Sequence, residues 1–229
     1  MNIEEKYEPT TVDDLVFADT KAENTCRRYA TSKPYKPLML WGPPGTAKTT
    51  TARAIIRDRF AAAGYDGAID EFNAADLTVS DFDILVNTAS WQRLNVGDPI
   101  LLINEFDEFE RTEQSRFRSW MDKHKWINLL VTTNEQPGVQ GVKQRLMPAL
   151  QSRFERIELA PPSLDDWLPR ARQIFQQEGF DVALDDLRVL LSTFNGDVRD
   201  MLPLIEEALE GLRQPRLPHT KPKPPSHVV

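Results

Sequence analysis

Short apolar runs alternate with helical patterns along the first two thirds of the chain. Five runs favour strands, at 37–41, 69–72, 100–103, 129–133 and 156–159, and helical patterns separate them. Strands that alternate with helices are joined by right-handed crossovers and form a parallel sheet with helices on both faces. The pattern predicts an α/β fold built on a five-stranded parallel sheet.

The pattern changes after Pro161 and Pro162. Ser163 can cap a helix that extends to about Glu178, and two further helices fit residues 184–193 and 198–212. The stretch 213–229 contains five prolines, four Lys or Arg residues and no acid, so it cannot bury enough apolar surface to fold alone. We therefore expect an α/β domain at 1–161, a small all-helical lid domain at 162–212 and a flexible Pro/Lys-rich tail at 213–229.

Composition narrows the class of protein. No run of about 18 apolar residues could span a bilayer, and the acidic, polar start MNIEEKYEPT lacks the layout of a secretory signal. A cytoplasmic protein without membrane contact is expected. Cys26 is the only cysteine, which excludes an intramolecular disulfide and a cysteine-based zinc site. The net charge of −7 means that any DNA contact must come from a local basic face or from assembly.

The strongest chemical signal lies between the first predicted strand and the helix that follows. A glycine-rich loop in this position is typical of the phosphate-binding loop of an NTPase, where backbone N–H groups surround phosphates, a lysine faces the β and γ groups and a hydroxyl can bind Mg²⁺. The residues expected to contact the nucleotide are Gly42, Pro43, Pro44, Gly45, Thr46, Ala47, Lys48, Thr49 and Thr50. Ala47 departs from the pattern, which has glycine at this position. The departure matters because a Cβ restricts backbone conformations with positive φ.

The run Ile100–Glu108 resembles a Walker B segment, in which a strand delivers acids beside the phosphates. The pattern begins with an aspartate that holds Mg²⁺, and a glutamate that orients the attacking water follows. Here Asn104 takes the aspartate position, so we expect metal affinity and hydrolysis to be weakened, while Glu105 is kept. Thr49 and Asn104 are the predicted Mg²⁺ residues.

Three later positions complete the expected site. Asn134 follows the fourth strand and would lie near the γ-phosphate as a sensor 1 residue, although an asparagine there is also a common turn former. Arg153 could project from the domain edge toward a neighbour's nucleotide, or form a surface salt bridge. Arg199, in the segment Gly196–Asp200, could reach back to the phosphates as a sensor 2 residue.

The order of these motifs resembles the clamp loader branch of AAA+ ATPases, which includes replication factor C small subunits and the ATPase subunit of phage clamp loaders. The resemblance covers roughly residues 4–210, and its most specific pieces are Glu5–Pro9, Thr11–Leu15, Phe72–Asp76 and Ala149–Arg153. It implies a homo- or hetero-oligomer of subunits that bind ATP at their interfaces, with Arg153 acting in trans. The implied partners are a sliding clamp and primer–template DNA.

The resemblance also assigns Lys6, Tyr7 and Pro9 to the adenine pocket, and it implies a collar domain after the lid. Since a proline-rich stretch follows the lid instead, we expect assembly to differ or to use another subunit. Five basic residues lie on one predicted helical stretch that could follow a DNA backbone, or could simply form a solvated face: Arg111, Arg116, Arg118, Lys123 and Lys125.

Two hypotheses follow. The first is an ATP-hydrolysing clamp-loader-like subunit in which Glu105 positions water, Lys48 and Thr49 hold phosphate and Mg²⁺, and Arg153 completes a neighbour's site. The alternative is a hydrolysis-deficient ATP-dependent regulator or adaptor of the transposition or helicase-loading type, in which Ala47 and Asn104 have exchanged turnover for a long-lived bound state. Stimulated phosphate release favours the first, and ATP-dependent assembly without release favours the second.

Overall fold

A computed structural model describes residues 2–32, 36–136 and 145–213. Five parallel strands form one sheet in the order β2-β3-β4-β1-β5. The strands are β1 Leu38–Trp41, β2 Glu71–Asn73, β3 Ile100–Asn104, β4 Asn128–Thr133 and β5 Glu155–Glu158. The five predicted strands and the α/β class are confirmed, and β2 begins two residues later than the pattern indicated.

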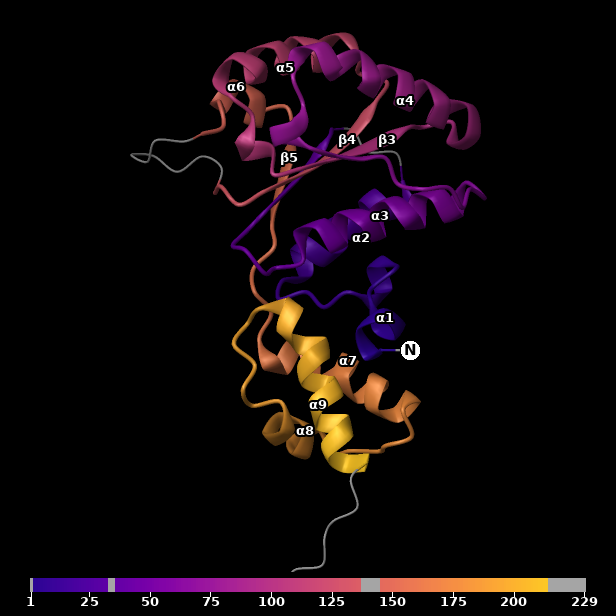
Figure 1. The fold of residues 1–229 in the computed structure, drawn as a ribbon, viewed down its shortest axis with the longest axis vertical. Coiled ribbons are helices and arrows are strands. Elements are labelled where there is room, and N and C mark those ends of the chain that lie inside the picture. Colours follow the sequence, from indigo (N-terminus) through magenta and orange to yellow (C-terminus); the bar gives the residue numbers. More distant parts are fainter. Residues whose placement is uncertain (1, 33–35, 137–144, 214–229) are drawn as a thin grey trace, which may run out of the picture.

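Helices cover both faces of the sheet (Figure 1). One face packs against α2 and α3 through a core that includes Cys26, Leu40 and Ile55, and the other packs against α4 and α5 around Phe106 and Phe117. Strands β3 and β4 contribute side chains to both cores, which explains their continuous apolar runs. The helices that surround the sheet are α2 Thr20–Thr31, α3 Lys48–Ala62, α4 Phe82–Val96, α5 Arg111–Lys123 and α6 Pro148–Gln151.

The helices after residue 162 pack around a third core. They are α7 Leu164–Gln177, α8 Leu184–Leu190 and α9 Met201–Arg213. Ser163 caps α7 as predicted, since its Oγ accepts a hydrogen bond from the Asp166 backbone N–H and Asp166 reciprocates. The third predicted helix begins with a 3₁₀ turn at Val198–Asp200 before α9.

The short first helix, α1 Ile3–Tyr7, packs against α9 although the two lie at opposite ends of the described chain (Figure 1). Ile3 and Tyr7 are buried in the same core as the lid helices. The lid core is therefore built from both ends of the sequence. The division at residues 161 and 162 stays a proposal, and the predicted tail lies outside the described residues beyond Arg213.

The remaining elements are single 3₁₀ turns at Val12–Asp14, Ala74–Asp76, Val79–Asp81 and Phe106–Glu108. Two of them flank the carboxyl ends of β2 and β3, where the predicted chemistry lies. Within the described parts of the chain, no helix is both long and apolar enough to cross a membrane.

Candidate nucleotide-binding site

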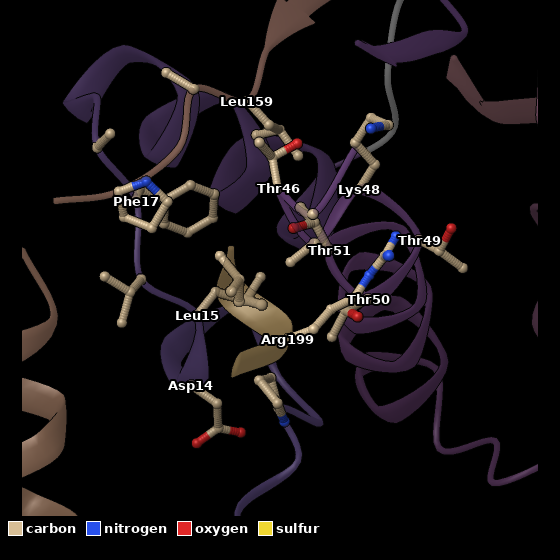
Figure 2. Close-up of a pocket in the computed structure, with 18 of the residues that line it drawn as sticks. Asp14, Leu15, Phe17, Thr46, Lys48, Thr49, Thr50, Thr51, Leu159 and Arg199 are labelled. Atoms are coloured by element: carbon tan, nitrogen blue, oxygen red, sulfur yellow. The ribbon is translucent and has the colours of Figure 1, made fainter. Parts of the chain in front are cut away.

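A cavity of about 660 Å³ opens where the sheet layer meets the lid. Its walls come from the ends of β3 and β4 and from three further parts, the N-terminal segment, the loop before α3 and the lid. Figure 2 shows residues of these three parts around the cavity. Parallel strands direct their carboxyl ends to the same edge of a sheet, and ligands of open α/β folds bind there. Residues 44–50 of the predicted phosphate loop line this cavity with Glu105, Asn134 and Arg199, whereas Gly42, Pro43 and Asn104 lie behind its wall.

The loop before α3 has the backbone shape that phosphate binding requires. Gly45 has φ 81° and Ala47 has φ 57° with ψ 29°, so both lie in the left-handed region. Ala47 thus adopts the positive φ that a Cβ disfavours, at a cost of about 1–2 kcal/mol. α3 then begins at Lys48, and the N–H groups of its first turn have no partner within the helix. This end of α3 suits an anion.

Lys48 is buried at the centre of the loop. Its ammonium group donates to the carbonyl oxygens of Gly42, at 3.0 Å, and Pro43, at 2.7 Å. Burial lowers the pKa of Lys48, nearby Arg199 lowers it further and Asp107 opposes the shift. Because burial disfavours the charged form of Lys48, an anion bound beside the ammonium group would stabilise that form strongly.

The end of β3 holds a small network of oxygen atoms. The Oδ1 atom of Asn104 accepts hydrogen bonds from the hydroxyls of Thr49, at 3.1 Å, and Thr132, at 3.0 Å. Hard oxygen donors of this kind fit Mg²⁺, which keeps several waters and takes further ligands from phosphates. Among the described residues, no cluster of three or more His, Cys, Asp or Glu side chains could hold a metal alone.

Glu105 follows Asn104 in a strained backbone conformation, with φ 52° and ψ 45°. Its N–H donates to the Thr132 hydroxyl at 3.3 Å, and its side chain is exposed at the cavity wall. A left-handed glutamate is uncommon and is found where the surrounding structure fixes it, often at functional sites. The turn directs this carboxylate away from the core.

Asp107 was not singled out from the sequence, although it lies beside the site. Its buried carboxylate accepts hydrogen bonds from the Thr133 hydroxyl, at 2.7 Å, and the Asn134 backbone N–H, at 3.3 Å. These bonds join the turn after β3 to the end of β4. They fix the backbone of Asn134, which lines the cavity next to Thr133.

The lid closes one side of the cavity through the segment Asp197–Arg199. The Val198 N–H donates to the Gly45 carbonyl at 2.9 Å, and a Cβ on Gly45 would lie 2.6 Å from the Asp197 carboxylate. Asp197 also accepts from the Arg199 backbone N–H. Figure 2 shows the Arg199 side chain extending toward the start of α3, near Thr49 and Thr50, which also line the cavity.

The N-terminal segment supplies the apolar part of the cavity. Pro9, Leu15 and Phe17 line it together with Tyr7. The Tyr7 hydroxyl donates to Glu178 of the lid at 2.9 Å, so the ring is fixed between the two parts of the molecule. An apolar wall beside a polar phosphate loop matches a base and its phosphates.

Other predicted residues lie outside the cavity. Arg153 follows α6 and pairs with Asp122 of α5 through two hydrogen bonds, at 3.0 and 2.6 Å. The structure therefore places Arg153 in the surface salt bridge that the sequence allowed, while its action toward a neighbour stays a prediction. The basic residues of α5 are exposed or half-buried and lie in two rows about 140° apart on the helix: Arg111 with Arg118, and Arg116 with Lys123. Lys125 is exposed after the helix.

Two further features were missed at the sequence level. Glu71 and Arg53 form an ion pair beside Asn104. The second feature is an exposed apolar stripe on α4, formed by Ile84, Trp91 and Leu94, which are 50%, 72% and 79% exposed. The helical pattern of α4 was visible, but neither exposure nor the ion pair could be deduced from spacing.

Similar proteins point to one group of relatives. The chain is 30% identical over 209 residues to replication factor C subunit 3 of Oryza sativa, which covers 88% of this chain and 55% of that protein. It is 25% identical to replication factor C subunit 5 of Mus musculus, over 88% of this chain and 58% of the relative, and 26% identical to the replication factor C small subunit of Aeropyrum pernix, over 89% and 61%. The chain thus spans little more than half the length of these relatives.

Solved structures support the fold. A mutant of Thermotoga maritima RuvB matches with a TM-score of 0.62 and 15% identity, covering 90% of this chain and 73% of that one. Domain III of the Thermotoga maritima replication initiation protein DnaA matches with a TM-score of 0.59 and 17% identity, over 88% and 90%. Residues 38–162, more than half of the chain, match the profile of the ATPase family associated with various cellular activities, and the chain therefore belongs to the AAA family.

Proposed function

We propose that this chain binds ATP with Mg²⁺ and hydrolyses it as one subunit of a clamp-loader-like assembly that acts on a sliding clamp and primer–template DNA. The observation that carries the proposal is the convergence of the phosphate loop, Glu105, Asn134 and Arg199 on one cavity. Similarity to replication factor C subunits supports the clamp loader assignment.

The cavity suggests how the nucleotide lies. The base would pack against Tyr7, Pro9 and Phe17, and the phosphates would lie over the N-terminus of α3. Lys48 would exchange its loop carbonyls for β- and γ-phosphate oxygens. Thr49 and Asn104 would hold Mg²⁺, directly or through water, and the ion would neutralise charge on the phosphates.

Hydrolysis would use the exposed carboxylate of Glu105. It accepts a proton from a water molecule as the water oxygen attacks the γ-phosphorus. The bond between that phosphorus and the β–γ bridging oxygen breaks, and its electron pair remains on ADP. Lys48 and Arg199 stabilise the charge that develops, and Asn134 orients the attacking water.

Arg153 lies outside the cavity of its own subunit, which supports a role at a neighbour's γ-phosphate. Reaching it would require the guanidinium to leave Asp122. This pair is partly solvent-exposed, with 30% of the Arg153 side chain and 51% of the Asp122 side chain accessible, so breaking it costs about 1 kcal/mol or less. The exposed basic rows of α5 would contact the DNA backbone.

The stripe on α4 supports a protein partner. Ile84 and Trp91 are seven residues apart and share one side of the helix, with Leu94 adjacent. Large apolar side chains exposed together mark interaction surfaces. Trp91→Glu should weaken association with that partner without changing ATP affinity.

Phosphate release tests the proposed function. Wild-type protein is assayed with Mg²⁺ and ATP, with and without primed DNA, while light scattering follows assembly. Arg153→Ala removes the trans arginine, and Arg188→Ala removes a comparable exposed arginine paired with Asp165 in the lid. DNA-stimulated release that is lost in Arg153→Ala and kept in Arg188→Ala supports the proposal.

The alternative function predicts a different outcome. Asn104 supplies an amide where the Walker B pattern has a carboxylate, which favours a slow or inactive site. Assembly on ATP without phosphate release would replace the clamp-loader-like ATPase with the regulator or adaptor. Release that is equal in all three proteins would contradict a trans role for Arg153.

A further inference from the structure

The amide of Asn104 is held from both sides. Its Oδ1 atom faces the hydroxyls of Thr49 and Thr132, and its Nδ2 atom donates to Glu71 Oε1 at 2.5 Å. Hydroxyls can donate or accept, but an ionised carboxylate can only accept. Glu71 therefore decides which atom of the amide faces Thr49, and it selects the oxygen.

Glu71 is itself fixed by Arg53. The guanidinium of Arg53, on α3, donates from Nε to Oε2 at 2.8 Å and from Nη2 to Oε1 at 2.9 Å. Bidentate pairing of this kind restricts both side chains. Glu71 lies on the edge strand β2, and the pair reaches across to the end of β3. A chain of contacts thus runs from Arg53 through Glu71 and Asn104 to Thr49.

We propose that Glu71, held by Arg53, is a positioning residue for the Mg²⁺–nucleotide site, and that it orients Asn104 so that an amide oxygen faces Thr49. The inference rests on the proposed function. It also explains the departure at position 104, because an aspartate there would place a carboxylate oxygen 2.5 Å from Glu71. Asparagine and Glu71 are then a matched pair.

The Mg²⁺ dependence of nucleotide binding tests the positioning role. Binding of a fluorescent ATP analogue is titrated with Mg²⁺ and repeated in EDTA. In Glu71→Ala the amide is free to rotate, and the Mg²⁺ concentration for half-maximal binding should rise about tenfold, the lower end of the effect of losing a partner that orients a metal ligand. Binding in EDTA, which depends on Lys48 and the loop, should be unchanged. Glu71→Gln, which keeps an acceptor oxygen, should restore part of the loss.

Glu155 offers a matched control. It is also the first residue of an edge strand, β5, and is paired with an arginine, Arg28, at 2.5 Å. Glu155→Ala should leave the Mg²⁺ requirement at the wild-type value. A Mg²⁺ requirement in Glu71→Ala that equals that of Glu155→Ala, or equal losses with and without Mg²⁺, would overturn the proposal.

A melting cycle without nucleotide keeps the inference separate from the proposed function. Asn104→Asp should lower the melting temperature when Glu71 is present, because two carboxylates would meet. The same change in the Glu71→Gln background should be neutral or stabilising, because the glutamine amide can donate to the aspartate. Equal effects in both backgrounds would contradict the pairing. Failure of the wild-type protein to bind ATP would contradict the proposed function, whereas the melting cycle would still decide whether the two residues are coupled.

Discussion

The phosphate loop and the end of β3 both depart from the residues expected at a nucleotide site, yet they accommodate the departure differently. In the loop, Ala47 replaces glycine and adopts the left-handed conformation that glycine would have taken. At the end of β3, Asn104 replaces aspartate and is held by another side chain, Glu71. At position 47 the backbone conformation accommodates the substitution, and at position 104 a side chain on the neighbouring strand β2 accommodates it.

The difference reflects what each position contributes. A phosphate loop works through backbone N–H groups, so a side-chain change matters only through the φ that it permits. A metal site works through side-chain oxygens, so a change alters charge and hydrogen bonding directly. Substitutions at side-chain-dependent positions are therefore coupled to their neighbours, and those at backbone-dependent positions are not.

The largest effect is expected at Lys48, the one side chain of the loop that contacts phosphate in this account. Lys48→Met should weaken ATP binding by about 100-fold, which corresponds to the loss of a charged hydrogen bond. Calorimetric titration with Mg²⁺–ATP measures it. Affinity within threefold of wild type would place the phosphates elsewhere.

Lys48 should also make the free energy of unfolding depend on pH. Its pKa is lowered by burial, so the native state binds its proton less tightly than the unfolded state. Stability should therefore rise with pH as the pH approaches the ordinary lysine pKa of 10.5 from below. Chemical denaturation between about pH 8 and about pH 10 should show this rise in wild-type protein and not in Lys48→Met. Parallel pH profiles would contradict it.

Replacing glycine by alanine should also lower the free energy of unfolding, and two such substitutions separate backbone strain from steric contact with the lid. Gly45 and Gly64 have φ of 81° and 69°, but of these two only a Cβ on Gly45 meets other atoms, the Asp197 carboxylate at 2.6 Å. Gly64 follows the C-terminus of α3, and Gly64→Ala should cost about 1 kcal/mol of unfolding free energy from strain alone. Gly45→Ala should cost about 2–3 kcal/mol, because the lid segment must also move. Equal losses would show that the lid does not press on the loop.

The smallest effect is expected at Ala47. Glycine relieves left-handed strain but adds unfolded-state entropy, so Ala47→Gly should change the unfolding free energy by less than about 1 kcal/mol. ATP affinity should stay within about twofold of wild type, a difference of ~0.4 kcal/mol. A tenfold gain in affinity would mean that Ala47 distorts the loop, and it would remove the contrast with Asn104.

Much of the fold could be predicted from the sequence because its signals are local. Apolar runs that end in Gly42 or Asn104 mark strands and the polar ends of those strands in the same few residues. The parallel order of the sheet then brings those ends together. This is why the loop, Glu105 and Asn134 could be assigned to one site, whereas Arg199 was assigned from its place at the start of the last predicted helix.

The remaining features depend on long-range packing. Tyr7 joins the lid core because α1 folds back onto α9, and no local pattern encodes that contact. The bond between Glu71 and Asn104 depends on β2 lying beside β3 and on the rotamers of both side chains. The sequence of α4 does not show whether Trp91 is buried or exposed, and only the packed structure shows that it is exposed.

The most direct test of the account is phosphate release by Glu105→Gln in the presence of primed DNA, measured beside ATP binding by the same protein. Glutamine keeps the size of the side chain and removes the proton acceptor. Glu105→Gln should keep wild-type ATP affinity and reduce turnover by about 100-fold or more. Turnover at the wild-type rate would contradict the assignment of Glu105 and of the end of β3 as the hydrolytic centre.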